Sequence, residues 1–345
     1  MLKGNKIAEC DMKVRLRNYE HPSDFNKIGQ FLSETYQPGD RHNNWLQSRW
    51  EYMHYHPAID ESALCNIGVW ETNGNIIAVV HFEHTLGEVY FEVHPDFIYM
   101  KPEMLEYAED HLSTRVDNGH YYLKVYINDF DIEFENIVRK RGYLKVKDIA
   151  DCWSAFKISH LFPAINVPNG FRLKSLQDDD DLAKLNTLIW RGFNHPGEPP
   201  EGGTDNMKRM QSATNYRKDL NIIVEAPDGR YAAYCGMWYE VRNKIAYVEP
   251  VCTDPDYRRL GLSTAAVLEG IRRCGREGAT VAFVGLSNQF TYPWVSRSYS
   301  TFTYGRINLM CNSATSRSIY YLDKSQLSIL LLFLFIRFVP KQVIP

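Results

Sequence analysis

The chain lacks the sequence features of several large protein classes. No Gly-Lys-Ser/Thr closes a glycine-rich loop and the spaced glycines of a Rossmann fingerprint are absent, which disfavours both common nucleotide-binding loops. The strongly apolar run at 329–336 is far shorter than the roughly 20 residues needed to cross a bilayer. Residues 1–17 contain no apolar core of a signal peptide. We therefore expect no membrane association.

An excess of charge and a cysteine framework are also missing. The formal net charge is −3 over 345 residues, without a sustained basic face, so we expect no nucleic-acid partner. The seven cysteines are odd in number and form no Cys-x-x-Cys pair, which predicts a reduced, cytoplasmic protein. His54, His56, His81 and His84 lack the carboxylate or cysteine spacing of a metal site, so no metal is expected.

The most informative stretch of the sequence lies between Glu249 and Gly278. A β-type run ends at Asp254-Pro255, and a short basic turn, 257–261, leads to a helix with a periodic apolar face. A strand, a tight turn and a helix N-terminus present unpaired backbone N–H groups and the positive end of a helix dipole to an anion. The order of elements is thus typical of an anion-binding turn.

Three residues of the turn strengthen this interpretation. Arg258 and Arg259 place positive charge beside the helix N-terminus. Gly261 has no Cβ, so a bound group can come close to the backbone there. The sequence therefore predicts a site shaped for a diphosphate, and a turn merely solvated by two arginines is the alternative.

At these residues the sequence resembles the GNAT-type N-acetyltransferases. Their acetyl-CoA signature, Arg/Gln-x-x-Gly-x-Gly/Ala, is matched by Arg258-x-x-Gly261-x-Ser263, which follows the Pro-x-Tyr-Arg form common in the family. Ser263 departs from the usual Gly or Ala, but it is small and can hydrogen-bond an oxygen. The resemblance implies acetyl-CoA as co-substrate. It places the turn on the pyrophosphate, strand N–H groups on the pantetheine arm and carbonyl, and Asn288 near the pantetheine. The cofactor-binding residues implied in this way are Val251, Cys252, Thr253, Arg258, Arg259, Leu260, Gly261, Leu262, Ser263, Thr264 and Asn288.

Glu249 is the candidate catalytic residue. It has the same strand parity as Val251 and Thr253, so if those side chains point inward Glu249 does too. A carboxylate there could deprotonate the acceptor amine directly or through water, and the alternative is a structural charge paired with an arginine. No tyrosine stands at the family's general-acid position, and nothing in its context places the nearby Tyr292.

Two segments of the chain repeat one coarse order of helices, hairpin, strand, helix and strand. We expect a first domain at 1–162, a proline-punctuated linker at 163–170 and the acetyl-CoA-binding domain at 171–290. The resemblance implies an α/β fold of the α+β type: two tandem acyl-CoA N-acyltransferase-like domains, each with a mixed, mostly antiparallel sheet flanked by helices. The first copy is degenerate, because 93–102 has no arginine, glycine or small residue where its pyrophosphate loop would be.

Local signals within the two segments predict individual elements. Asn73-Gly74 and Asp228-Gly229 read as hairpin turns. Residues 22–24 and the acidic run 178–181 read as helix N-caps. A strand is predicted at Cys65–Glu71.

Beyond Phe290 the sequence stops following the family pattern. Family members close with Tyr-x-x-Leu-Gly-Phe, whereas Pro293 here interrupts a run without helical periodicity. Reading the codons from Phe290 to Gly305 one base out of register permits Tyr-Leu-Ser-Leu-Gly-Phe, and Trp294-Val295 forces its glycine. We hypothesise that one base was lost near Phe290, which would make 291–345 an out-of-frame or disordered tail. A divergent extension is the alternative.

The sequence thus predicts an acetyl-CoA-dependent N-acetyltransferase, with activity reduced by the altered C-terminus. The acetyl group would pass to a primary amine of a small molecule or a peptide N-terminus by direct attack in a ternary complex. The alternative is a non-catalytic acyl-CoA-binding or regulatory module, or an inactive pseudoenzyme. Neither the identity of the acceptor nor the oligomeric state follows from the sequence.

Overall fold

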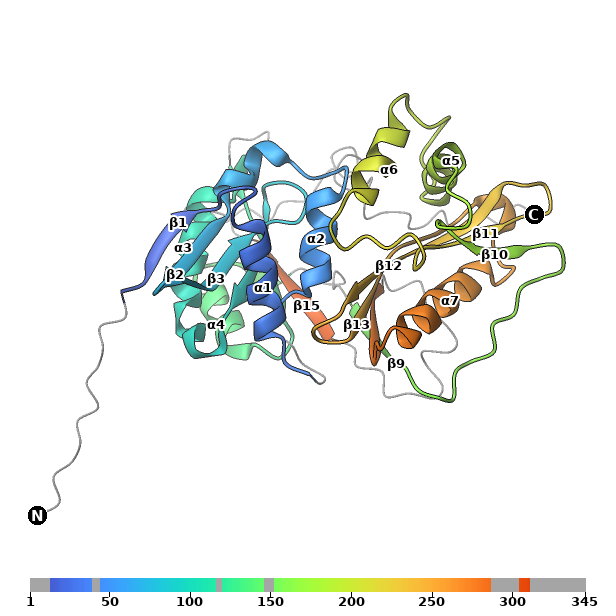
Figure 1. The fold of residues 1–345 in the computed structure, drawn as a ribbon. Coiled ribbons are helices and arrows are strands. Elements are labelled where there is room, and N and C mark those ends of the chain that lie inside the picture. Colours follow the sequence, from blue (N-terminus) through green and yellow to red (C-terminus); the bar gives the residue numbers. More distant parts are fainter. Residues whose placement is uncertain (1–12, 39–43, 116–119, 146–151, 287–303, 311–345) are drawn as a thin grey trace, which may run out of the picture.

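The computed structural model describes residues 13–38, 44–115, 120–145, 152–286 and 304–310 (Figure 1). The elements of the first half follow in chain order: β1 (Arg15–Asn18), α1 (Phe25–Thr35), α2 (Gln47–Tyr55), η1 (Glu61–Asn66), β2 (Gly68–Thr72), β3 (Asn75–His81), β4 (Glu88–Val93), η2 (Pro95–Met100), α3 (Lys101–His111), β5 (Thr114–Arg115), β6 (Tyr121–Tyr122), β7 (Lys124–Asn128), α4 (Ile132–Lys140), β8 (Leu144–Lys145) and β9 (Cys152–Lys157).

The second half repeats the order of the first. Its elements are β10 (Arg172–Ser175), α5 (Leu182–Gly192), α6 (Gly203–Gln211), β11 (Ile222–Glu225), β12 (Tyr231–Glu240), β13 (Ile245–Thr253), η3 (Pro255–Tyr257), α7 (Leu262–Arg276) and β14 (Val281–Leu286), followed by β15 (Tyr304–Met310).

One sheet of 13 strands runs through both halves, in the order β1-β2-β3-β4-β7-β15-β9-β14-β13-β12-β11-β10, with β8 beside β15. Strands β5 and β6 form a separate pair. All neighbours in the large sheet are antiparallel except β4 with β7 and β13 with β14. Each half therefore has a mixed, mostly antiparallel sheet with one parallel pair at the same place, which confirms the predicted tandem fold class.

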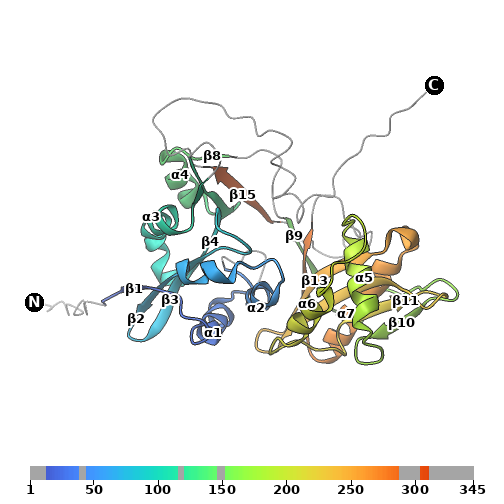
Figure 2. The same cartoon turned by 90° about the horizontal axis from the view of Figure 1, so that it is seen from above.

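The two halves exchange strands at their junction. β9 comes at the end of the first predicted domain, yet it pairs antiparallel with β14 of the second half over its whole length, from Cys152 opposite Leu286 to Lys157 opposite Val281. β15 comes from the predicted tail, 291–345, and pairs antiparallel with β7 of the first half. Figure 2 shows β15 lying against the first half, and β9 on the side of the second half, where β14 separates it from β13. The domain boundaries expected from the sequence, 1–162 and 171–290, stay a prediction. Each half nevertheless contributes a strand to the sheet of the other.

Most local signals act as the sequence predicts. Asn73 and Gly74 have φ of 51° and 78°, the left-handed pair of a type I′ hairpin turn. Asp181 caps α5 by accepting hydrogen bonds of 3.0 Å from the N–H groups of Ala183 and Lys184. Within the run Asp178–Asp181, the last residue is thus the cap of α5, whereas Asp178 accepts hydrogen bonds from Ser175.

Two local predictions are wrong. The strand predicted at Cys65–Glu71 begins only at Gly68, because Cys65 belongs to the 3₁₀ turn η1. The Asp24 side chain makes no cap hydrogen bond to α1; its carboxylate accepts instead from Arg17, at 2.5 and 3.0 Å. A nearby guanidinium outcompetes the helix N–H groups for this buried carboxylate.

The helices cover opposite faces of the second-half sheet (Figure 1). Alternate residues of β11 show this: Ile222 and Val224 pack with α7, whereas Ile223 packs with α5. On the α5 face, α2 of the first half also reaches the sheet, because Tyr52 joins the core cluster of Trp238 and Tyr247. The first half therefore forms a wall on the face opposite α7.

Candidate functional site

The candidate site is built around a bulge in β13. Val248 pairs with Met237 and Val251 with Cys235, so Glu249 and Pro250 together stand opposite the single residue Gly236. A Cβ on Gly236 would lie 2.3 Å from the Glu249 carbonyl oxygen, so only glycine fits at that position. Trp238, in the same strand as Gly236, also holds the bulge, because its indole N–H donates to the Glu249 carbonyl at 3.1 Å.

The bulge corrects the predicted orientation of Glu249. Strand parity cannot be carried across an extra residue. Val251 packs with the α7-side core, whereas Cys252, directly opposite Tyr234, packs on the α5 side with Leu188. Glu249 interacts with Tyr52 of the first half, so its side chain belongs to the α5 face, opposite Val251.

Strands β13 and β14 stop pairing at Val248, directly before the bulge. Their parallel pairing covers Ile245–Val248 and Val281–Val284 and ends there, while β13 continues to Thr253. Backbone groups of a strand alternate between its two neighbours, so past Val248 some of these groups face a side where β14 no longer pairs. Within the described part of the chain no strand pairs with this edge of β13, which can therefore hydrogen-bond an extended ligand.

An ion-pair network fixes the turn that follows β13. Asp254 is 3% exposed, and Arg191 of α5 donates to it through Nε at 2.7 Å and Nη2 at 3.2 Å. Burial alone would raise the pKa of Asp254, but the hydrogen bonds from Arg191 hold it below its ordinary value. Arg191 and Arg230 both reach Asp256, at 2.9 and 3.0 Å. The turn is therefore tied to α5 and to the β11–β12 hairpin.

The turn ends in a helix N-terminus with unpaired donors. Gly261 is the N-cap of α7, with φ of 78° and no side-chain cap, and nothing lies within 4 Å of the position of a Cβ. No backbone N–H from Arg259 to Thr264 donates a hydrogen bond to another residue of the described ranges. Six donors at the positive end of a 15-residue helix fit a diphosphate.

The predicted turn residues take different positions around these donors. Arg258 is occupied in holding the turn, since its guanidinium donates to the carbonyls of Thr253 and Gly192 and to Asn194 Oδ1, at 3.2, 2.9 and 2.6 Å. Arg259 and Leu260 are exposed beside the helix start, whereas Leu262 is buried. Ser263 and Thr264 are half-buried in the first turn of α7. Asn288 lies outside the described residues.

Glu249 is a half-buried carboxylate with a shifted pKa. Its pKa is raised to about 7, first by burial and then by the negative charge of Glu83, while the positive charge of Arg49 opposes both effects. A carboxylate with this pKa is divided between its acid and base forms near neutral pH, as a general base requires. Arg49 of the first half is the arginine whose charge acts on Glu249, so both the base and the structural charge paired with an arginine stay predictions.

Cys252 is a core residue. It is 5% exposed, its Sγ lies 4.0 Å from the Leu188 carbonyl oxygen, and burial raises the pKa of its thiol to about 12. A Cβ on Gly192 would come within 2.8 Å of the Cys252 Cβ, so α5 packs directly on it. The thiol has no means of acting as a nucleophile, and only the Cys252 backbone could serve a bound ligand.

The sequence did not point to the groups that the first half adds. Arg49 and Tyr52 come from α2 and Glu83 from the segment after β3, and all three interact with Glu249. Arg49 is 6% exposed although it is charged. Its position two residues from Glu51, within a helix of mixed polarity, carries no recognisable sequence signal.

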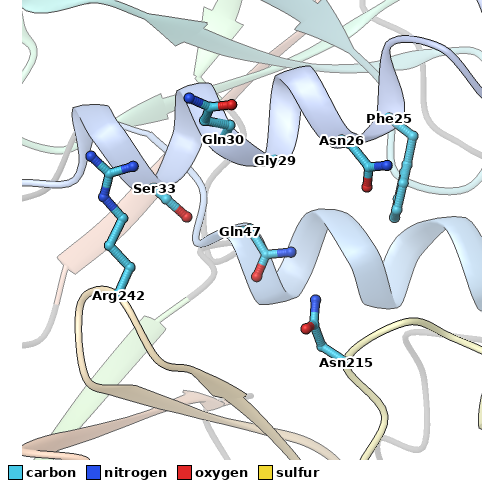
Figure 3. A pocket seen from close by; sticks show the side chains of 8 residues that line it. All are labelled: Phe25, Asn26, Gly29, Gln30, Ser33, Gln47, Asn215 and Arg242. Carbon is cyan, nitrogen blue, oxygen red and sulfur yellow. The ribbon is translucent and has the colours of Figure 1, made fainter.

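A polar cavity of about 220 Å³ lies between the two halves (Figure 3). Helices α1 and α2 supply one wall, and Asn215 and Arg242 of the second half supply the other. Behind it, Asn215 donates through its backbone N–H and its side chain to the buried Glu51, at 2.7 and 2.6 Å. These contacts bind the two halves together.

Among the described residues, no group of three or more His, Cys, Asp or Glu side chains could hold a metal ion. No helix in the described ranges is both long and apolar enough to cross a membrane.

The fold and the turn define the class of the protein. Residues 183–293 match the model of the acetyltransferase (GNAT) family. The chain resembles a GCN5-related N-acetyltransferase from Sphaerobacter thermophilus (TM-score 0.56, 16% identity, covering 89% of this chain and 98% of that one). It also resembles a tandem GNAT protein from the clavulanic acid biosynthesis pathway (TM-score 0.60, 12% identity, 88% and 100% covered). A GNAT-family acetyltransferase from Colwellia psychrerythraea gives a TM-score of 0.53 at 9% identity, with 86% and 98% covered.

No curated protein matches the sequence. The chain has a GNAT-like fold in two tandem copies, and residues 183–293 match the acetyltransferase model of that family. Acyl transfer is the chemistry of this class.

Proposed function

We propose that this protein is a cytoplasmic N-acetyltransferase that transfers the acetyl group of acetyl-CoA to a primary amine. The acceptor is a small-molecule amine or a peptide N-terminus, and it attacks directly in a ternary complex. One observation carries the proposal: the unpaired donors before α7 and the carboxylate of Glu249 flank the same open stretch of β13. The four described free cysteines, Cys65, Cys235, Cys252 and Cys274, are consistent with a reducing compartment.

The turn binds the co-substrate in this proposal. The N–H groups of 259–264 receive the pyrophosphate, Arg259 adds charge, and Arg258 holds the turn in shape. The open backbone of Val251, Cys252 and Thr253 receives the pantetheine arm and the carbonyl. Acetyl-CoA supplies an acetyl group on a thioester, whose C–S bond breaks as the N–C bond forms and whose sulfur leaves as a thiolate.

Glu249 removes the proton from the acceptor. An ammonium cannot attack, so the amine must lose a proton before or during formation of the N–C bond. With a pKa raised to about 7, the Glu249 carboxylate can accept that proton and release it to solvent after each turnover. The first half closes the α5 face above Glu249 through Tyr52, and we assign it the role of one wall of the acceptor site.

Binding is tested first, by isothermal titration with acetyl-CoA. Binding together with thiol release over a panel of amines supports the enzyme. Binding without thiol release from any amine favours the alternative, a non-catalytic acyl-CoA-binding module. If a folded sample gives no heat of binding with acetyl-CoA, both the enzyme and the non-catalytic binding module are excluded.

A matched pair of glycines tests the turn. Gly261 and Gly202 are both helix N-caps, with φ of 78° and 84° and nothing within 4 Å of a Cβ. Gly261→Leu and Gly202→Leu should each cost about 1–2 kcal/mol from the left-handed backbone. Only Gly261→Leu should weaken acetyl-CoA binding, by tenfold or more. Equal affinities in the two variants would refute the turn assignment.

Glu249→Gln tests the base. We expect kcat to fall by about 10²–10⁴-fold, with the Kd for acetyl-CoA within a factor of two of wild type. The wild-type kcat/KM should fall tenfold per pH unit below about 7, and this acid limb should disappear in the variant. An unchanged pH profile would assign the base to another group.

A further inference from the structure

The two halves meet at a buried ion pair beside Glu249. Arg49 Nε donates to Glu83 Oε1 at 2.7 Å, and Nη2 donates to Oε2 at 2.6 Å. The side chains are 7% and 14% exposed. The Tyr90 hydroxyl donates to the same Glu83 oxygen at 3.3 Å. A bidentate pair held this deeply is fixed in geometry, and both residues come from the half without a pyrophosphate loop.

Aromatic contacts connect this pair to β13. The Arg49 guanidinium carbon lies 4.0 Å from the Trp45 ring centroid and 5.3 Å from that of Trp153 in β9. Trp153 in turn stacks on Tyr247 of β13, with centroids 5.6 Å apart and planes at 20°. The exchanged strand β9 therefore forms the surface against which Arg49 packs.

A second connection reaches Glu249 itself. Tyr52, one helical turn from Arg49 on α2, meets Trp238 edge-on at 5.9 Å, and Trp238 donates to the Glu249 carbonyl. Helix α2 thus fixes both the backbone of Glu249 and the ion pair near it.

We infer that the Arg49–Glu83 ion pair is a positioning device of the first half that sets the charge felt by Glu249 across the interface. The inference rests on the proposed role of Glu249 as the base. The two members act in opposite directions: Glu83 favours the protonated form of Glu249 and Arg49 favours the carboxylate. The titratable and charged groups on the elements around Glu249 and the ion pair include Arg49, Tyr52, His56, Glu83, His84, Tyr90, Cys235, Tyr247 and Cys252. Burial lowers the pKa of both histidines.

This opposition gives a test that a purely structural ion pair would fail. Glu83→Gln removes the like charge, so the acid limb of kcat/KM should move to lower pH, by roughly 1 pH unit. Arg49→Met removes the positive charge that opposes the effect of Glu83, so the limb should move to higher pH by a similar amount. Arg49→Lys keeps the positive charge and should leave the limb near its wild-type position.

Lys101→Met is the matched control. Lys101 and Asp131 form a first-half ion pair of the same burial, 8% and 14% exposed, away from β13. Its loss should lower the melting temperature without moving the acid limb. Shifts of Glu83→Gln and Arg49→Met in the same direction, or no shift in either folded variant, would overturn the inference.

A second measurement keeps the inference separate from the proposed activity. Carbon-13 NMR titration of glutamate carboxyl groups in the free protein, with Glu249 assigned from Glu249→Gln, reports its pKa without turnover. Opposite displacements in the two variants support the positioning role even if no amine is acetylated. An unmoved Glu249 titration would refute it even in an active enzyme.

Discussion

Gly236 of β12 lies directly against the backbone of Glu249, so closely that a Cβ there would approach the Glu249 carbonyl oxygen to 2.3 Å. The contact is with backbone, which cannot move aside as a flexible side chain can. The bulge that turns Glu249 toward the first half therefore depends on a residue in the neighbouring strand.

Gly236→Ala should lower the free energy of unfolding by about 1–3 kcal/mol, because the added methyl overpacks the bulge. We also expect a loss of thiol release larger than the loss of stability explains, since Glu249 would be displaced. Urea denaturation and steady-state assays measure the two effects. Gly29→Ala is the control: its Cβ would meet Gln47 at an ordinary 3.5 Å, inside helix α1. Equal behaviour of the two variants would argue against the bulge.

Glu249→Gln should stabilise the protein at alkaline pH. The pKa of Glu249 is raised from 4.5 to about 7 in the folded state, so the unfolded chain ionises first. The stability that protonated Glu249 contributes is full below pH 4.5 and is lost as pH rises through 7. At pH 8 the variant should unfold with a free energy up to about 3 kcal/mol above wild type.

Unfolding curves at pH 4 and pH 8 test this, with the exposed Glu201→Gln as control. The difference between Glu249→Gln and wild type should be small at pH 4. A variant less stable than wild type at pH 8 would contradict the raised pKa.

Asp254→Asn should have the opposite pH dependence. The folded-state pKa of Asp254 lies below 3.8, so its stabilising contribution is present above that pH and is lost as pH falls through the folded value. We expect a loss of about 1–3 kcal/mol at pH 7, from weakened hydrogen bonds to Arg191, and a difference that shrinks toward pH 2.

The exposed pair of Asp205 and Lys208 provides the comparison, since Asp205→Asn should cost under about 0.5 kcal/mol. Equal losses for Asp205→Asn and Asp254→Asn at pH 7 would show that the Arg191 network does not hold the turn.

The strand exchange predicts that the second half cannot be separated at the expected linker. A fragment 159–345 lacks β9, which leaves β14 as an open edge and removes Trp153 and Phe156, both buried. A fragment 152–345 keeps them. The longer fragment should be more stable by at least about 3 kcal/mol, as measured by thermal melting. Equal melting temperatures would mean that β9 is not part of the second sheet.

The nucleotide sequence across the codons for Asn288 to Trp294 tests the frameshift hypothesis. A missing base would make 291–345 an artefact, and the restored frame should encode Tyr-Leu-Ser-Leu-Gly-Phe followed by a strand sequence. In the restored protein, the strand encoded after Tyr-Leu-Ser-Leu-Gly-Phe would then pair with β7 in place of β15. A confirmed frame, with an intact-protein mass to match, would make β15 genuine and remove the hypothesis.

Sequence reasoning succeeded where the determining interactions are local. The order of elements from β13 to α7 and the hairpin at Asn73-Gly74 follow from turn chemistry and helix periodicity within a few residues. The start of the strand predicted at Cys65–Glu71 was placed three residues too early. An apolar run alone does not show where a 3₁₀ turn ends and a strand begins.

The sequence by itself determined the donor turn, because a glycine at a helix N-terminus needs no distant partner to expose its N–H groups. Only the tertiary structure decided which way Glu249 points and what surrounds it. A bulge opposite Gly236 reverses strand parity, and Arg49 and Glu83 reach Glu249 from another half of the chain. Contacts between residues so far apart in sequence depend on the whole packing, and no spacing along the chain encodes them.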